Sequence, residues 1–345
     1  MAAKDTMNLA VRSVQTSADW HSALTKFEDR SIFHTSEWLD TIGETTGFEL
    51  IRLEVSDRNG PVMLFPLFAK KLGGIVSLLS PPPGLALEFL GPLYRFPPRA
   101  KRDRKESMAV EATRLAIEFC EARYHPSLFF VRCGPPVQDI RPFQWLGFQS
   151  TPMYTYEIDL RQGLVSVLES FKLELRSEIS RMRNRITITD AGHEVAGVIH
   201  RAIETRFRAQ DLTFDVPVDY LRTLLTRFAP TNMISFLAQL DGSPVGGLVA
   251  TNYNGVTAAW IGARSVDTRG IPVTDLLVWR AIEWGFEMGA TRFELMGGNV
   301  QRLRPFKAKY NADLVSFFQL ERSRLAGRLL SSAYRHMKAV RTRKT

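Results

Sequence analysis

The segment GGNVQRLRPFKAKYNADL, residues 297–314, alternates aromatic and cationic side chains directly after two glycines. Its Phe306, Lys307, Lys309 and Tyr310 fit two interpretations. Lysines between aromatic core residues are ordinary on a surface strand, where they provide solubility. A lysine held after a glycine turn can instead reach a sheltered site and stabilise an anion. The segment by itself leaves both interpretations open.

Four arginines are candidates for binding a phosphorylated donor, and Lys309 and Tyr310 are further candidates for binding donor or substrate. Arg176 and Arg181 lie on the polar side of a predicted helix, and Arg264 and Arg269 lie in the loop before a later helix. The free N–H groups at a helix start bind phosphates, which is why arginines just before one are of interest. Asp275, in the first turn of that later helix, opposes a phosphate there. Solvated surface arginines are the alternative.

Glu294 is the candidate general base for taking a proton from an attacking amine. It alternates with Phe293 and Leu295 at a strand end near the glycine loop, and so faces away from both. An ordinary strand-end acid is the alternative. Three histidines have no partner motif: His34, His125 and His200. The sequence contains no P-loop, dinucleotide fingerprint or nucleophile elbow, which favours direct transfer over a covalent enzyme intermediate.

The composition is that of a globular chain of about two domains. The chain has 345 residues, of which 45% are hydrophobic. Its longest apolar stretch, residues 62–69, is far shorter than the roughly 20 residues of a membrane span. The amino-terminal segment has no apolar core of signal-peptide length. Cys120 and Cys133 show no metal-ligand spacing. These features predict a cytoplasmic protein without a metal site.

The formal net charge of +9 is concentrated in two segments. Residues 322–345 contain eight Lys and Arg and no acid, and residues 99–106 read RAKRDRKE. Such segments suit phosphates, nucleic acid or an anionic membrane face. The first also carries an apolar stripe at helical spacing, made of Leu325, Leu329, Leu330, Ala333, Tyr334 and Met337. It therefore predicts a basic amphipathic helix that either lies on a membrane or packs its stripe on the protein.

The first half, residues 1–150, predicts a mixed α/β domain. A short helix from about Ser36 precedes a strand, and a second apolar strand follows at 60–72. Pro and Gly make residues 80–93 a loop. Apolar residues at helical spacing then predict a helix over 103–124, followed by a buried strand at 127–133.

The second half, residues 151–321, predicts a second domain. A strand at 153–160 precedes one long helix over 164–182, whose apolar residues form a single face. Two more helices, at about 194–209 and 217–228, precede three strands joined by the tight turns DGSP and YNG. A helix capped by Thr274 and closed by Gly289 leads into a last strand and the glycine loop.

Three segments in this order resemble Fem-type peptidyltransferases and BioF2-like acyltransferases of the GNAT superfamily. The first is FHTSEWLDTIGETTGFE, residues 33–49. The second is a strand ending in Asp-Leu, followed by a helix with Arg176, Ile179 and Arg181. The third is the closing signature Phe-Lys-x-Lys-Tyr-Asn at 306–311. The resemblance covers roughly residues 30–320.

The resemblance implies two GNAT-like α/β domains, each a mixed and largely antiparallel sheet flanked by helices, with a site in the cleft between them. It implies an N-acyltransferase that moves an acyl or aminoacyl group from acyl-CoA or aminoacyl-tRNA to an amine, with no tightly bound cofactor. The family assigns oxyanion stabilisation to the Phe-Lys pair, here Phe306 and Lys307. If this segment is extended, Lys309 points the opposite way, so only one lysine serves. The segment TRGIPV departs from the CoA-binding pattern of GNAT enzymes.

The acceptor implied by the resemblance is a small-molecule or lipid-linked amine, such as a cell-envelope or polysaccharide precursor. The expected location is the cytoplasm, with peripheral contact at the inner membrane face through residues 322–345. A protein of another class remains as the alternative. In that case the chain is a non-catalytic binder of nucleic acid or anionic membrane on a worn acyltransferase scaffold.

Overall fold

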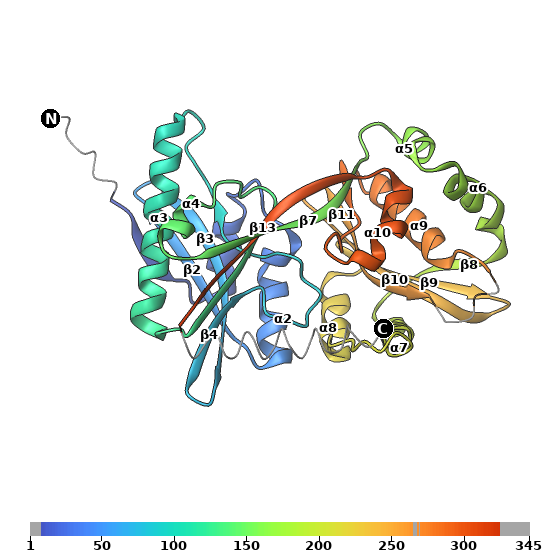
Figure 1. The fold of residues 1–345 in the computed structure, drawn as a ribbon, viewed down its shortest axis with the longest axis horizontal. Helices are drawn as coiled ribbons and strands as arrows, with labels where there is room; N and C mark the ends of the chain where they lie inside the picture. The colour runs from blue at the N-terminus through green and yellow to red at the C-terminus, as the bar shows by residue number, and fades with distance from the viewer. Residues whose placement is uncertain (1–7, 265–267, 269, 325–345) are drawn as a thin grey trace. The chain divides into compact units, whose positions relative to one another are not determined.

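The computed structural model describes residues 8–264, 268 and 270–324 (Figure 1). The chain forms two compact units. Among the described residues, the first unit contains 8–82, 87–152 and 317–324, and the second contains 83–86 and most of 153–316. Arg269 lies outside the described residues, and so does the predicted tail helix 322–345 from residue 325 onward. Its first two residues, 322 and 323, end a strand and are not helical. No helix within them is long and apolar enough to cross a bilayer.

The first unit is built on a mixed sheet with the strand order β1-β2-β3-β4-β6-β13. Strands β4 and β6 are parallel, and the other neighbours are antiparallel. The short β5 (Leu93–Tyr94) pairs with β3. The strands are β1 (Ala10–Ser13), β2 (Glu49–Asp57), β3 (Gly60–Leu72), β4 (Ile75–Ser80), β6 (Leu128–Cys133) and β13 (Asp313–Ser323).

Helices cover both faces of this sheet, which explains why β3 is an almost unbroken apolar run. The long helix α3 (Arg102–Tyr124) packs against β2 and β3. The helices α1 (Ser17–Leu24) and α2 (Ser36–Thr46) also pack against the sheet, and the short η1 (Ile32–His34) precedes α2. The helix α4 (Arg141–Trp145) packs on α3. Thr35 caps α2 through its side chain, and Gly47 ends it in the left-handed conformation.

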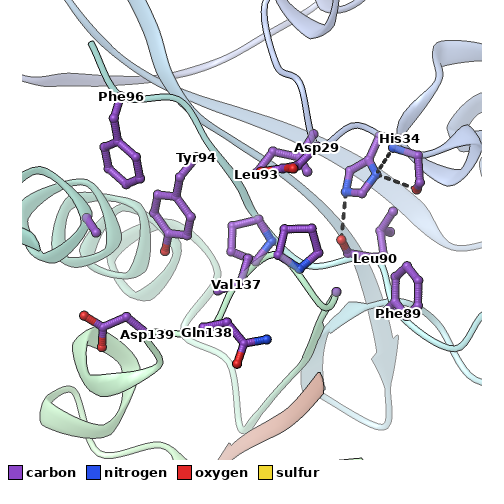
Figure 2. Close-up of a pocket in the computed structure, with 15 residues that line it drawn as sticks. Asp29, His34, Phe89, Leu90, Leu93, Tyr94, Phe96, Val137, Gln138 and Asp139 are labelled. Atoms are coloured by element: carbon purple, nitrogen blue, oxygen red, sulfur yellow. Dashed lines mark hydrogen bonds between the residues drawn. The ribbon is translucent and has the colours of Figure 1, made fainter. Parts of the chain in front are cut away.

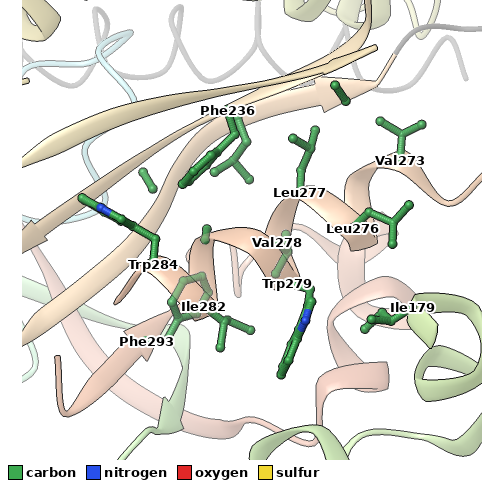
Figure 3. Packing of buried hydrophobic residues seen from close by; sticks show 14 of the residues in the cluster. Ile179, Phe236, Val273, Leu276, Leu277, Val278, Trp279, Ile282, Trp284 and Phe293 are labelled. Carbon is green, nitrogen blue, oxygen red and sulfur yellow. The ribbon is translucent and has the colours of Figure 1, made fainter. Parts of the chain in front are cut away.

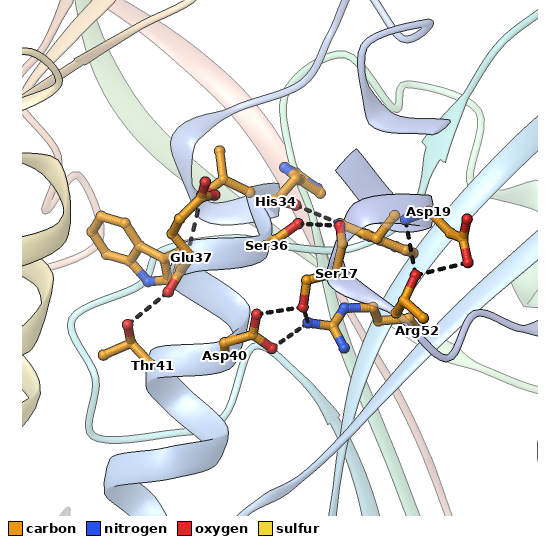
Figure 4. Close-up of polar contacts among 12 residues, drawn as sticks. Ser17, Asp19, His34, Ser36, Glu37, Asp40, Thr41 and Arg52 are labelled. Carbon is orange, nitrogen blue, oxygen red and sulfur yellow. Dashed lines mark hydrogen bonds and ion pairs between the residues drawn. The ribbon is translucent and has the colours of Figure 1, made fainter. Parts of the chain in front are cut away.

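A partly buried ion pair joins α1, α2 and β2 (Figure 4). Arg52 alternates in β2 with Ile51 and Leu53, which face the α3 side of the sheet, so its side chain lies on the other side. Its guanidinium donates hydrogen bonds to Asp40 in α2 and to Ser17 in α1. Both helices are thereby fixed to the sheet by one cation.

The second unit contains a sheet with the strand order β7-β12-β11-β10-β9-β8. Only β11 and β12 are parallel among the pairs with an assigned register. The tight turns after β9 and β10 have left-handed residues at Asp241–Gly242 and Asn254–Gly255, as the sequence predicts. The strands are β7 (Gln149–Asp159), β8 (Thr187–Ala191), β9 (Met233–Leu240), β10 (Ser243–Tyr253), β11 (Val256–Arg264) and β12 (Arg292–Glu294).

Helix α9 (Val273–Glu287) forms the centre of this unit's apolar core (Figure 3). Its Leu277 and Ile282 pack with Phe236 of β9 and Phe293 of β12 in one buried cluster. The helices α7 (Ala196–Arg208) and α8 (Val218–Phe228) pack on β10, β11 and β9. Short 3₁₀ turns connect other elements: η2 (Arg183–Arg185), η3 (His193–Val195) and η4 (Gln301–Leu303).

The single long helix predicted over 164–182 is wrong in one respect. The structure divides it into α5 (Leu164–Ser170) and α6 (Leu173–Met182), with Phe171 extended between them. At the break, the backbone N–H of Lys172 donates to the carbonyl oxygen of Lys309 over 2.9 Å. A tertiary hydrogen bond therefore replaces one of the helix, while the apolar stripe still packs into the core.

Two further local predictions are corrected. Helix α9 begins at Val273 rather than after Thr274, because Leu276 N–H already donates to the Pro272 carbonyl. Residues 304–310 are helical rather than extended. They form α10 (Arg304–Lys307) and η5 (Ala308–Tyr310), with proline in the first turn, where its missing N–H costs nothing. The argument that Lys307 and Lys309 point to opposite sides of a strand therefore does not hold.

Candidate functional site

Lys307 is buried at the carboxyl end of β12. Lys307 is 8% exposed, and its Nζ donates a hydrogen bond to the carbonyl oxygen of Leu295 over 2.5 Å. Nζ also lies 5.5 Å from the centroid of the Phe306 ring. The last residue of α10 thus holds a cation on the carbonyl of the residue that follows β12. This is the arrangement in which a lysine can act on a developing negative charge.

Lys309 has a different environment, because it forms an ion pair with the buried Asp275 of α9. Its Nζ lies 2.7 Å from Asp275 Oδ2, and the Tyr310 hydroxyl donates to Oδ1 over 2.7 Å. Burial, followed by the charge of Asp275, raises the Tyr310 pKa well above its usual value. Tyr310 therefore remains a hydrogen-bond donor. Asp275 joins η5 to the start of α9 through Lys309 and Tyr310, which stay candidates for binding donor or substrate.

Glu294 is buried on the strand next to Leu295. The Thr155 hydroxyl of β7 donates to its Oε1 over 2.8 Å. In the antiparallel register, Glu294 lies opposite Glu157, and on its other side it is the last residue that pairs with β11, at Ala258. The two candidates are thus attached to consecutive residues of the chain, because the carboxylate belongs to Glu294 and the Lys307 ammonium donates to the carbonyl of Leu295.

The glycine loop is held tightly against β7. The Asn299 side chain accepts a hydrogen bond from Tyr154 N–H over 2.9 Å and donates to the Tyr154 carbonyl over 2.8 Å. A Cβ at Gly298 would lie 2.3 Å from that carbonyl oxygen, so this position has no room for a side chain. Gly297 has φ +66°. These contacts fix the chain between Glu294 and Lys307.

The strands β11 and β12 separate beside Glu294. Their assigned parallel register covers only 256–258 with 292–294, whereas β11 continues to Arg264. After Glu294 the chain keeps its contact with β7, because Leu295 N–H donates to the Tyr156 carbonyl. The pairing of β10 with β11 also contains a bulge: the register shifts between Val249 and Ala250 of β10, opposite Trp260 of β11. Bulges and diverging strands are common next to ligand sites.

The arginine candidates are placed in the second unit, apart from Arg269. Arg176 of α6 is half-buried, and its Nε has no hydrogen-bond partner among the described residues. Arg181, on the same helix, is exposed. Arg264 ends β11 and donates to the Thr268 hydroxyl over 3.0 Å. None of these contacts tests whether the arginines bind a phosphorylated donor, so they remain candidates for that role.

Residue types alone did not single out Thr155, Asn299 or Asp275 as parts of this site. The signal for Asn299 was its place directly after two glycines, and for Asp275 its place in the first turn of a helix. Thr155 had none, because its contact with Glu294 joins residues 139 positions apart. No cluster of three or more metal-ligand side chains occurs in the part of the chain that the structure describes.

The first unit contains a pocket of about 240 Å³ (Figure 2). Its wall is mainly apolar and includes Phe89, Leu93 and Tyr94. His34 lies at its edge, buried, with Nε2 2.7 Å from the Leu90 carbonyl and Nδ1 2.8 Å from the Ser31 hydroxyl. Burial lowers the His34 pKa to about 4. His34 is therefore a neutral side chain that joins two loops.

The architecture defines the class of protein. Residues 170–308 match the family model for the acetyltransferase (GNAT) domain, which covers α6 to α10 and the strands between them. No curated protein matches the sequence at a significant level. The fold is that of tandem GNAT proteins, as the resemblance implies.

Solved structures with this fold include FemX, with a TM-score of 0.68, 12% identity, and coverage of 90% of this chain and 96% of FemX. A tandem GNAT protein from the clavulanic acid biosynthesis pathway has a TM-score of 0.54 and 14% identity. The match covers 91% of this chain and 98% of that protein. The third is the C-terminal domain of a protein from Agrobacterium fabrum that is assigned as a lysylphosphatidylglycerol synthetase. Its TM-score is 0.54 and its identity 13%, and the match covers 91% of this chain and 95% of that domain. The similarity to the Fem-type group thus holds at the level of fold, and the GNAT fold supports an acyltransferase.

Proposed function

We propose that this protein transfers an aminoacyl group from an activated ester to an amine, with Lys307 and Glu294 as the catalytic residues. The observation that carries the proposal is the position of Lys307, whose buried ammonium lies on the Leu295 carbonyl at the end of β12. A solvated surface lysine would not be buried. A cation fixed in a site of low polarity stabilises charge that develops during reaction far better than one in water.

The proposed reaction needs no covalent enzyme intermediate. The acceptor nitrogen forms a bond to the donor's carbonyl carbon, and Lys307 stabilises the resulting oxyanion. Glu294 removes a proton from the attacking nitrogen. When the carbon–oxygen bond of the ester breaks, the same proton passes to the leaving oxygen. The products are an amide and a free hydroxyl group.

The surroundings of α9 favour an aminoacyl-tRNA over acyl-CoA as the donor. A helix start binds pyrophosphate through its free N–H groups and partial positive charge. At the start of α9 that charge already faces the buried carboxylate of Asp275, which Tyr310 and Lys309 hold in place. The name of one structure of similar fold, the assigned lysylphosphatidylglycerol synthetase, includes a product that carries an aminoacyl group, which agrees with aminoacyl transfer. The acceptor we propose is a small or lipid-linked amine of the cell envelope.

Replacing Lys307 tests the proposal. We expect Lys307→Met to lower kcat by about 10²–10³ and Lys307→Arg to retain part of the activity, because the arginine keeps a cation. Transfer of a radiolabelled amino acid from charged tRNA mixtures to a panel of amines measures the rate, and ribonuclease treatment of the donor identifies its carrier. Circular dichroism confirms that each variant is folded. Unchanged transfer by Lys307→Met would remove this lysine from the mechanism, and ribonuclease-resistant transfer from acyl-CoA would refute the donor.

A further inference from the structure

The basic segment at residues 99–106 is not used by the proposed transfer site. In the structure it is the turn before α3 together with the first turn of that helix. Five of its eight residues are cations and two are acids. All five cations, Arg99, Lys101, Arg102, Arg104 and Lys105, are exposed. The charge is therefore presented to solvent on one end of one helix.

This placement opposes the intrinsic preference of a helix. The first turn of an α-helix carries a partial positive charge, so acids stabilise it and cations destabilise it. Here Arg102, Arg104 and Lys105 occupy the first turn with a single acid, Asp103. Local conflicts of this kind are expected where a surface serves binding. The helix end adds its own positive potential to that of the side chains.

An exposed tryptophan is connected to the same surface. Trp145, at the end of α4, is 65% exposed. The Arg141 guanidinium lies 5.7 Å from the centroid of its ring. Arg141 also contacts Glu106 Oε1 at 3.3 Å, and Glu106 accepts from Arg102 Nε over 2.8 Å. These contacts place an aromatic ring and a stacked arginine beside the cations of α3.

Cations that follow a phosphate backbone, together with an exposed ring for an unstacked base, are the two elements of single-stranded nucleic-acid binding. We propose that Arg99, Lys101, Arg102, Arg104, Lys105, Arg141 and Trp145 form an RNA-binding surface of the first unit. The surface fits RNA with unpaired bases, and its assignment to the donor RNA rests on the proposed function.

The side chains of this surface favour RNA over an anionic membrane. Membrane binding by a surface helix normally buries a stripe of several apolar side chains. Among the described residues of this surface, Trp145 is the one large exposed apolar side chain, and the carboxylates of Glu106 and Asp139 lie beside its partner Arg141. One ring is sufficient to stack on one base.

Binding of full-length protein to fluorescent, deacylated tRNA tests the surface without any transfer reaction. The variant Arg99→Gln/Lys101→Gln/Lys105→Gln should bind about tenfold more weakly, and the slope of log affinity against log salt should fall by about 2. The matched control is Lys26→Gln/Arg58→Gln/Lys71→Gln, which removes one arginine and two lysines that are exposed elsewhere in the same unit. We expect the control to change affinity less than twofold.

Trp145 is tested separately. Trp145→Ala should weaken binding of tRNA and of a 12-nucleotide single strand about tenfold, with the salt slope unchanged, and Trp145→Phe should restore most of the affinity. Equal losses in the two triple variants, or wild-type affinity in Trp145→Ala, would overturn the proposal. So would loss of binding to phosphatidylglycerol vesicles in the first triple variant with tRNA affinity intact, because the surface would then be a lipid site.

The binding assay also separates this inference from the proposed function. If tRNA binds through these residues while transfer uses acyl-CoA, the donor proposal is refuted and the RNA-binding surface remains. If transfer depends on charged tRNA while the first triple variant keeps wild-type tRNA affinity and KM, the surface is refuted and the transfer proposal remains. Failure of the wild-type protein to bind tRNA refutes the surface.

Discussion

Lys307 and Lys309 lie two residues apart, on the same short helical segment, and both approach the ring of Phe306. Their oxygen partners differ. Lys307 donates to a neutral carbonyl, whereas Lys309 is paired with a carboxylate. A cation already neutralised by a close carboxylate offers little further stabilisation to an oxyanion. The prediction that only one of the two serves chemistry therefore rests on this difference in pairing and no longer on strand geometry.

This difference predicts opposite effects of two identical substitutions. Lys309→Met should lower the free energy of unfolding by about 2 kcal/mol, because the buried Asp275 loses a charged partner, and should leave kcat within a fewfold. Lys307→Met should remove most of kcat and destabilise less. Urea denaturation measures the free energy of unfolding of each variant, and the transfer assay measures its kcat. Loss of kcat in Lys309→Met at full stability would contradict the assignment.

His34 predicts a pH dependence of stability. Its folded pKa of about 4 is below its usual 6.5, because burial disfavours the charged ring. Below pH 6.5 the unfolded chain therefore binds a proton that the folded protein does not. Its stabilising effect is complete above pH 6.5 and is lost as pH falls toward 4, by about 2 kcal/mol at pH 5.

The variant His34→Asn isolates this effect. It should show a flatter dependence of unfolding free energy on pH between 7 and 5 than the wild-type protein, measured by urea denaturation at each pH. Parallel curves for the two proteins would contradict this prediction, because they would show that His34 binds its proton equally well in the folded and unfolded states. Histidines elsewhere in the chain cancel in the comparison.

At the scale of elements, the glycine loop and β7 act together as the support of the site. The loop approaches β7 closely at Gly298, and Asn299 pairs with the backbone of Tyr154. Because Thr155 is the next residue and holds Glu294, a shift of the loop relative to β7 would disturb both catalytic candidates.

Gly298→Ala should therefore destabilise the protein by about 2–3 kcal/mol and lower kcat, since the new methyl group has no space beside the Tyr154 carbonyl. Gly43→Ala is the matched control. Gly43 lies in α2, where an added Cβ would make ordinary contacts at 3.7 and 3.8 Å. It should stabilise the protein by about 0.5–1 kcal/mol. Thermal unfolding compares the two, and equal effects would show that the close approach does not constrain the loop.

The whole molecule consists of two units whose chain segments are interleaved. Residues 83–86 belong to the second unit although they interrupt the first in sequence, and 317–324 return to the first. Within the second unit, Trp260 Nε1 donates to the Ala86 carbonyl over 2.9 Å. Strand β7 continues through residue 150 without a break. A boundary near 150 is therefore a change of unit inside a strand and not a linker.

Limited digestion with proteinase K should accordingly cut the exposed turn at 98–101 before it cuts near 150. Proteases need an accessible, flexible backbone, and the backbone of β7 is part of a sheet. Mass spectrometry of early fragments identifies the cuts. A first cut within 149–152, releasing two stable halves, would show that the units fold as separate domains joined by a linker.

The sequence by itself determined most elements, because hydrophobic periodicity and turn residues are local properties. The helix over 103–124, the hairpin at Asn254–Gly255 and the apolar stripe of 164–182 all follow from residues close together in the chain. The break at Phe171 did not, since its cause is the carbonyl of Lys309, 137 positions away from the N–H of Lys172. The surroundings of the lysines were undetermined for the same reason. Only the tertiary structure brings Asp275 to Lys309 and the Leu295 carbonyl to Lys307. Burial and pairing depend on contacts between distant segments, and these contacts give two similar cations different partners.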